Sequence, residues 1–393
     1  MTILPQEMDS PAPAQLDEER LAWLAMVLAP GLGPRRILDA VKGLDAPSRI
    51  FTLSLTELEG LRFPAETAQF IFDGKARQIA EEEWARVVAQ GATLLTFGCP
   101  EYPERLKEIY DPPPVLWVRG ATGLLSRPAI AIVGTRHPSP YGSGVAEMLA
   151  RDLAVRRLLI VSGMARGIDT CAHKGALAAR MPTVAVWGTG IDVIYPKENK
   201  KLAEEILATG GAIVSEVPMG TFPAPQNFPR RNRILSGLSV AVLVVEAAEN
   251  SGTRVTARCA ADQSRDLYAV PGNVTNKNSW TPNTLIKQGA KLVATWEDVW
   301  EDLPSQVRLE LEAEAGVESK PEAAASLLPE PVLRPEEAMV LEVLRSDESL
   351  QIDEILELLE TQLTSSEVFT ALFELEITGR VRGMPGKNYV RTM

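Results

Sequence analysis

Four short apolar segments, each ending in a glycine or a polar residue and separated from the next by a helical stretch, constrain the fold of this chain most strongly. A continuous apolar run suits a strand that is covered on both faces, as in a parallel sheet flanked by helices. We therefore predict an α/β fold with an extended, Rossmann-like, doubly wound parallel sheet, in which ligands collect beyond the carboxyl ends of the strands. The four segments are Ala129–Gly134, Leu158–Gly163, Thr183–Gly188 and Val240–Glu246.

The pattern changes on both sides of this sheet. Residues 16–90 have helical spacing of apolar residues, residues 304–335 are acidic and rich in Pro, Ala and Glu, and residues 336–393 give three amphipathic helices and a hairpin, which is typical of a winged helix. The predicted organisation is a disordered N-terminus (1–15), a helical domain (16–90), a Rossmann-like domain (91–303), an acidic linker (304–335) and a winged-helix domain (336–393).

The sequence does not decide the roles of the two flanking domains. The break at Pro30–Pro34 between two helices resembles a helix-hairpin-helix or SAM-like module, in which the N–H groups of the glycine turn can meet a DNA phosphate; a plain helical corner explains it equally well. The third helix of the winged-helix domain, 365–377, holds three Glu and no Lys or Arg. For this domain we favour a protein contact or a structural role over reading of a DNA duplex.

Several function classes are disfavoured by composition. The longest apolar segments fall far short of the ~18–20 residues that cross a bilayer, and the N-terminus lacks the pattern of an export signal. Cys99, Cys171 and Cys259 are single and far apart, and with only two histidines their spacing builds no zinc site. Their odd number argues against a disulfide framework. We expect a cytoplasmic protein without membrane, metal or cofactor.

The net charge of −12 does not exclude a DNA partner, because the charge is unevenly distributed. Residues 301–393 hold 20 Asp and Glu against 8 Lys and Arg, which accounts for the whole excess. Residues 130–240 instead hold 13 Lys and Arg against 8 Asp and Glu. The basic residues therefore gather on the predicted sheet.

The loops that follow the first two strands carry candidate phosphate-binding groups. Gly134 turns the chain and Arg136 stands close to a helix N-terminus, which favours a phosphate, although an Arg in that place can also neutralise a neighbouring acid. The second loop, 162–169, predicts an anion nest at the start of a helix, but it matches neither a P-loop nor a dinucleotide fingerprint. On that helix, His173 is a possible base, and we favour a structural histidine.

The third and fourth loops add cations and an aromatic residue. In the third, Val193 stands where a Rossmann fingerprint needs its last glycine, and the three lysines of Lys197–Lys201 form either a solvated helix face or a phosphate contact. The fourth, Asn227–Arg233, joins three arginines and two asparagines to a phenylalanine, as a groove for single-stranded nucleic acid requires. The alternative is a structural arginine cluster, which needs buried carboxylates; the candidates are Asp169, Glu216 and Glu246.

Residues 90–295 resemble the DNA-processing protein A (DprA, also called Smf) family in a series of motifs in the same order and spacing. These motifs are VGTRHPSPYG, SGMARGIDTCAHKGAL, WGTGIDVIYPKENKKL, SEVPMGTFPAPQNFPRRNRILSGLS, LVVEAAENSGTRVTA and YAVPGNV. The resemblance implies a mediator without enzymatic activity that binds and protects single-stranded DNA, forms a homodimer through the Rossmann-like domain and loads the RecA recombinase during natural transformation.

Carried over residue by residue, the resemblance implies a positively charged DNA pocket. Three departures concern the surface near Arg254, Ser264 and 279–282, where residues differ from the family pattern, and they bear on dimer and RecA contacts more than on this pocket. The predicted DNA-binding residues are Gly134, Arg136, Ser162, Gly163, Arg166, Gly167, Lys174, Lys197, Asn199, Lys200, Lys201, Asn227, Phe228, Arg230, Arg231, Asn232 and Arg233.

Two enzyme classes are the alternatives. A nucleotide phosphoribohydrolase uses a similar sheet, but its P-G-G-x-G-T-x-x-E stretch is absent here; the nearest matches are Trp187–Gly190 and Ala248–Gly252, and neither joins the glycines to the needed glutamate. An NAD-dependent oxidoreductase lacks both its glycine fingerprint and a catalytic pair. The mediator interpretation accounts for the Arg-Asn-Phe cluster and for the additional end domains.

Overall fold

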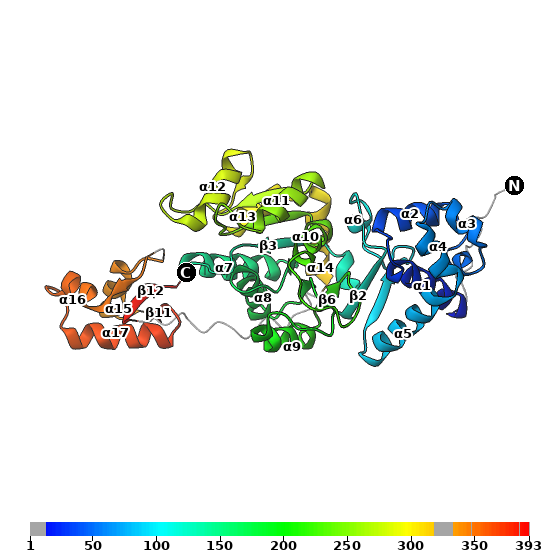
Figure 1. Ribbon diagram of the computed structural model, residues 1–393. Coiled ribbons are helices and arrows are strands. Elements are labelled where there is room, and N and C mark those ends of the chain that lie inside the picture. The colour runs from blue at the N-terminus through cyan, green and yellow to red at the C-terminus, as the bar shows by residue number, and fades with distance from the viewer. Residues whose placement is uncertain (1–12, 318–332, 347, 385, 393) are drawn as a thin grey trace.

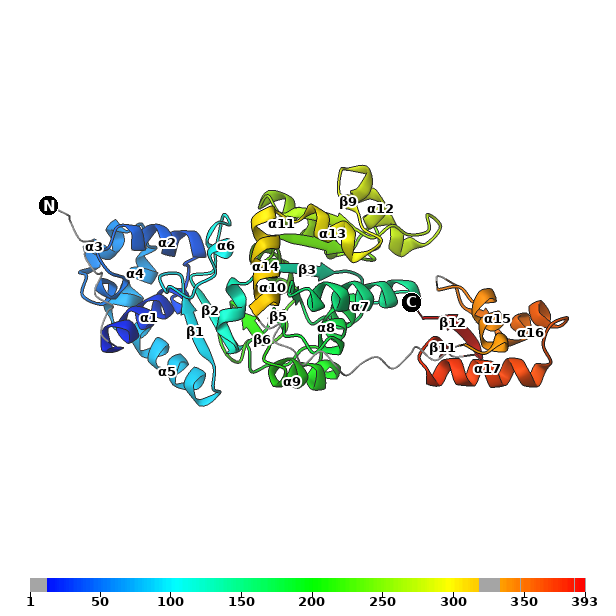
Figure 2. The same ribbon diagram turned by 180° about the vertical axis from the view of Figure 1, so that it is seen from behind.

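The computed structural model describes residues 13–317, 333–346, 348–384 and 386–392. An N-terminal helical unit lies at one end, an α/β unit in the middle and a smaller C-terminal unit at the other end (Figures 1 and 2). Most of the predicted disordered N-terminus, 1–15, is outside the described residues, and the first helix begins at Pro13. No helix within the described ranges has the length and apolar character needed to cross a bilayer.

The N-terminal unit is helical, as its apolar spacing predicts. Gly31 has a φ of 78°, a conformation that glycine adopts without strain, and makes the turn between the first two helices. The third helix begins with a capping box formed by Ser54 and Glu57. The helices are α1 (Pro13–Leu28), α2 (Pro34–Lys42), α3 (Leu55–Gly60), α4 (Ala65–Phe72) and α5 (Lys75–Ala89), with a 3-10 turn at Pro47–Phe51.

A single sheet forms the centre of the molecule, with strand order β1-β2-β6-β5-β4-β3-β7-β8-β9. The four apolar segments are β3, β4, β5 and β7, which lie side by side, and all neighbours from β6 to β9 are parallel. The strands are β1 (Thr93–Thr96), β2 (Val115–Gly120), β3 (Ala129–Val133), β4 (Leu159–Ser162), β5 (Thr183–Trp187), β6 (Ala212–Ser215), β7 (Ala241–Val244), β8 (Asp266–Ala269) and β9 (Lys291–Leu292).

The predicted parallel sheet is thereby confirmed, except at one edge. There β1 pairs antiparallel with β2, and β2 pairs antiparallel with β6. The connection from β1 to β2 contains only the short helix α6 (Glu104–Lys107), not the crossover helix that joins parallel strands.

Both faces of the sheet are buried, which explains the continuous apolar runs. Along β3, Ile130 and Ile132 belong to one apolar cluster, whereas Ala131 and Val133 belong to the cluster on the other face. Because successive strand residues point to opposite faces, both sets must be apolar. One face is covered by α7 (Pro140–Val155), α8 (Ile168–Ala178) and α13 (Trp296–Asp302), and the other by α6, α10 (Asn227–Leu238) and α11 (Thr253–Asp262).

The helical unit packs against the antiparallel edge of the sheet. Side chains of α1 and α5 share one apolar cluster with Trp117 of β2 and with α9 (Lys200–Ala208). The fully buried carboxylate of Glu83 on α5 accepts hydrogen bonds from Trp117 Nε1–H (2.9 Å) and from the Met219 backbone N–H (2.8 Å). Since a buried charge needs such partners, Glu83 ties α5 to the sheet.

The predicted linker begins later than its composition indicates. Residues 305–317 form the helix α14 (Ser305–Val317), whose Val307 and Leu311 are buried in the same cluster as α7 and α13. These two apolar residues are four positions apart and therefore lie on the same face of the helix. The overall composition of the segment is acidic, so composition alone does not reveal this apolar face. The remainder of the predicted linker up to residue 332 lies outside the described residues.

The C-terminal unit has the predicted winged-helix elements. Three helices surround one apolar core that includes Val340, Ile355 and Leu372. The sequence missed a short third strand, β10, which pairs with the hairpin. The elements are α15 (Pro335–Val343), β10 (Leu350–Gln351), α16 (Ile352–Leu359), α17 (Ser365–Ile377), β11 (Val381–Met384) and β12 (Asn388–Arg391).

Candidate nucleic-acid interface

A cleft of about 680 Å³ opens at the carboxyl ends of the central strands. A narrower pocket shares Arg136, Phe228 and Arg231 with it and continues toward Arg166 and Tyr195. We call the two together the strand-end groove. Its lining includes Gly134, Arg136, Gly163, Ala165, Arg166, Asp169, Tyr195, Phe228, Arg231, Asn232, Asn250, Gly252, Lys277 and Trp280.

Exposed Arg136 and half-buried Phe228 lie together in both parts of the groove. The Arg136 guanidinium carbon lies 5.7 Å from the centroid of the Phe228 ring, and the Phe228 ring lies 5.5 Å from that of Tyr195. An exposed cation beside one ring of an aromatic pair can hold a phosphate next to a surface on which a base stacks. Tyr195 was not among the residues predicted for the site. Its position in a loop that follows a strand could have indicated it.

Gly134 allows the loop of Arg136 to pack closely. A Cβ at this position would lie 2.5 Å from Cγ1 of Ile168 and 2.8 Å from the carbonyl oxygen of Glu246. Only glycine permits this approach. Glu246 then accepts hydrogen bonds from the N–H and the hydroxyl of Ser139, which caps α7. The glutamate that the sequence offered as an arginine partner therefore holds the capping residue of α7 in place.

The predicted anion nest is wrong, because the chain satisfies the loop itself. The N–H groups of Gly163 and Ala165 donate to Oδ2 of Asp169 at 3.2 and 3.3 Å, and Ser162 is buried with its hydroxyl donating to the Ile132 carbonyl. Burial raises the pKa of the Asp169 carboxyl, while the charge of Arg231 works in the opposite direction. Sequence spacing does not show that Asp169 folds back onto its own loop.

Arg231 is a buried scaffold of the groove, although it was predicted as a DNA contact. Only 6% of the residue is exposed, and Nη1 donates to the carbonyls of Gly163 (2.8 Å) and Val186. Burial lowers the pKa of the Arg231 guanidinium to about 10, and Asp169 opposes that shift. A Cβ on Gly163 would lie 2.4 Å from Nη1, so this glycine makes room for the guanidinium.

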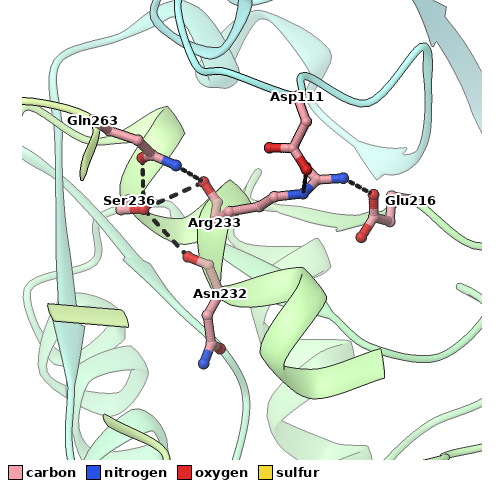
Figure 3. Close-up of polar contacts among 6 residues, drawn as sticks. All are labelled: Asp111, Glu216, Asn232, Arg233, Ser236 and Gln263. Carbon is pink, nitrogen blue, oxygen red and sulfur yellow. Dashed lines mark hydrogen bonds and ion pairs between the residues drawn. The ribbon is translucent and has the colours of Figure 1, made fainter. Parts of the chain in front are cut away.

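Arg233 is not part of the groove, and its prediction as a DNA contact is wrong. It lies between two carboxylates, with Nε 3.1 Å from Asp111 and Nη2 paired with Glu216 (Figure 3). Burial raises the pKa of Glu216, and the Arg233 charge counteracts it. Arg233 is therefore a structural arginine, which is the alternative stated for this motif. Its partner Glu216 is one of the three carboxylates named as candidates.

The arginine motif forms the first turns of α10 instead of a loop before a strand. Pro229 is tolerated there because the first turn of a helix needs no N–H donor from it. A helix sends successive side chains in different directions, which separates buried Arg231 and Arg233 from exposed Arg230. Half-buried Asn232 lines the groove, whereas Asn227 and Arg230 do not.

The third loop, and the remaining predicted residues of the second loop and its helix, contribute less than predicted. Asn199 is buried and donates to the Met164 carbonyl and the Thr170 hydroxyl, both at 2.9 Å, so it joins loops and does not face a ligand. Arg166 is exposed and pairs with Glu198. Gly167, with a φ of 76°, makes a turn. The predicted lysines Lys174, Lys197, Lys200 and Lys201 are exposed but lie outside the groove lining.

His173 is structural. It is fully buried on α8, with Nδ1 2.9 Å from Oγ1 of Thr183, whose hydroxyl donates to the Ile160 carbonyl. Because that hydroxyl already donates, the Nδ1–H is the donor in the pair with Thr183. Burial lowers the pKa of His173 to about 3, and the charge of Arg231 adds to this effect.

Acidification should therefore destabilise the fold through His173. The folded pKa of about 3 lies below the ordinary 6.5, so between these values the unfolded chain binds a proton that the folded chain refuses. Stability is lost as the pH falls through this window, on the order of 3 kcal/mol by about pH 4. The variant His173→Asn, whose amide can replace the Nδ1 donor, should lose less stability than the wild type as the pH falls. Urea unfolding at several pH values measures this difference. Parallel curves for both proteins would contradict this role.

The fold and the groove define a Rossmann-like protein with a winged-helix unit and a basic, aromatic cleft at its strand ends. Across residues 93–304 the chain matches the family model described as DNA recombination-mediator protein A, and residues 320–387 match the DprA winged helix domain. The chain belongs to the DNA recombination-mediator protein A (DprA/Smf) family, as its motifs predict. Family membership makes it a DNA-processing mediator and not an enzyme.

Individual relatives agree with this assignment. The chain is 41% identical to Protein Smf of Escherichia coli over 290 residues, covering 74% of this chain and 75% of that protein. It is 42% identical to DNA processing protein DprA of Bacillus subtilis over 218 residues, covering 55% and 73%. The crystal structure of DprA from Streptococcus pneumoniae superposes with a TM-score of 0.63 at 34% identity, covering 73% of this chain and 98% of that one.

Proposed function

We propose that this chain binds single-stranded DNA in the strand-end groove, protects incoming strands and loads the RecA recombinase on them during natural transformation. The observation that carries the proposal is the exposed Arg136 beside the Phe228 ring, which itself lies against the Tyr195 ring. A single strand offers phosphates and unpaired bases together, and this groove has a partner for each. In a duplex the bases are paired and stacked, out of reach of such rings.

The partner and the assembly state belong to the same proposal. RecA and the homodimer are implied by the family resemblance, and a cytoplasmic location fits three free cysteines. Leu292 of β9 is an apolar residue of the Rossmann-like unit that is 45% exposed and available for a dimer surface. On the winged helix, α17 exposes 50% of Phe369 and 62% of Phe373, which supports a protein contact for that unit.

Titration of a labelled oligo-dT at several salt concentrations tests the proposal. We expect affinity to fall with salt, with a slope of about −0.7 for each phosphate neutralised, because counterions are released from the strand. Duplex of the same length should not displace the oligo-dT. Absence of binding at low salt would overturn the proposed function.

A further inference from the structure

A second cleft, of about 910 Å³, lies between the N-terminal helical unit and the loop that precedes β2. Three exposed arginines line it: Arg35 and Arg36 in the first turn of α2, and Arg62 after α3. Tyr110, from the loop between α6 and β2, lines the same cleft with 77% of its surface exposed. None of these residues lines the strand-end groove.

The arginines of this cleft have no acidic partner in the described parts of the chain. Asp39 pairs with Lys42 at 3.1 Å, and Asp111 pairs with Arg233 at 3.1 Å, so both acids of the cleft are occupied. Arg36 donates to the Gly31 carbonyl at 3.2 Å, which leaves its charge without a carboxylate in the described residues. The cleft therefore presents uncompensated positive charge, which attracts a polyanion.

Tyr110 adds a stacking surface to these cations. The Arg35 guanidinium carbon lies 3.8 Å from the centroid of the Tyr110 ring. This contact holds the ring in place while the ring stays largely open to solvent. A cation beside an accessible ring is the arrangement that binds the phosphate and the base of one nucleotide.

The second cleft adjoins the strand-end groove through α10. Helix α6 lies between α2 and α10 in both views (Figures 1 and 2). Asp111, next to Tyr110, contacts Arg233 of α10 (Figure 3), and exposed Arg230 acts on Glu216, the other partner of Arg233. Exposed Arg230 follows Phe228 and Pro229, which line the groove, in the first turn of α10.

We propose that single-stranded DNA leaving the strand-end groove crosses Arg230 and enters the second cleft, where Arg35 and Arg62 bind phosphates and Tyr110 stacks a base. This inference rests on the proposed function, because it requires a strand in the groove. It assigns to the N-terminal unit a direct part in strand binding and makes affinity depend on strand length.

A series of oligo-dT strands from about 4 to about 16 nucleotides, the usual range of site sizes, tests the inference on the full chain. The double variant Arg35→Ala/Arg62→Ala should bind the shortest strand as the wild type does. It should bind the longest about a hundredfold or more weakly, since two charge-assisted contacts of about 1.5–3 kcal/mol each are lost. The salt slope for that strand should flatten by about 1.4 for two lost contacts.

Matched variants separate this effect from charge or folding in general. Arg49→Ala removes one exposed arginine of the same unit that is outside the cleft and should change nothing. Tyr110→Ala should weaken only long strands, and Tyr110→Phe should retain the wild-type affinity. Thermal melting should show that all the variants fold, because the substituted residues are exposed.

The outcomes distinguish this inference from the proposed function. Equal affinity of wild type and double variant at every length would overturn the second cleft and leave the groove intact. Equal weakening at every length, or a loss confined to duplex binding, would also overturn it. If the wild type binds no oligo-dT at all, the proposed function itself fails.

Discussion

Arg136→Ala should lower the affinity for single-stranded DNA by about ten- to a hundredfold, the largest loss expected from any exposed residue. Its guanidinium is the free cation shared by both parts of the strand-end groove, and it stands beside Phe228. Losing one charge-assisted contact costs about 1.5–3 kcal/mol. The salt slope should flatten by about 0.7, because one fewer phosphate is neutralised. Titration of oligo-dT at several salt concentrations measures both quantities.

Controls decide whether the loss belongs to the groove. Arg151→Ala removes an exposed arginine of α7 that pairs with Asp152 and lies outside the groove, and it should bind as the wild type does. Arg136→Lys should retain part of the affinity, since it keeps the charge but loses the planar fork. Unchanged affinity and slope for Arg136→Ala would show that the groove is not the binding site.

Arg231→Met should have the largest effect on stability, a loss of about 3 kcal/mol or more in urea unfolding, because breaking a buried charge arrangement leaves its partners uncompensated. The carbonyls of Gly163 and Val186 lose their donor, and buried Asp169 loses the cation that stabilises its charge. The control variant Arg230→Met replaces the exposed neighbouring arginine, and it should have the same stability as the wild type. An Arg231→Met protein of wild-type stability would contradict the scaffold role.

The pH dependence of this variant gives an independent check. Burial already raises the pKa of Asp169, and removing Arg231 raises it further. The folded variant then keeps a proton that the unfolded chain releases above the ordinary pKa of 3.8. Its stability deficit should therefore grow as the pH rises and shrink in acid. Adding Asp169→Asn should restore part of the stability at neutral pH, because no uncompensated charge remains.

Sequence patterns predicted the parallel centre of the sheet and the winged-helix unit. The apolar runs at β3, β4, β5 and β7 predicted adjacent parallel strands, since only a doubly covered strand is apolar at every position. The motif order from Val133 to Val274 identified the family. The patterns failed where local composition misleads: α14 has an acidic composition but a buried apolar stripe, and the antiparallel edge follows from a missing crossover helix.

Which cations remain free for a ligand was decided only by the tertiary structure. Arg230, Arg231 and Arg233 are neighbours in one basic motif, yet the fold exposes the first and buries the other two. The partners of the buried pair come from distant positions, such as Asp111 and Gly163. A motif shows the charges of a segment, whereas their availability depends on which carboxylates and carbonyls the fold brings within hydrogen-bonding distance.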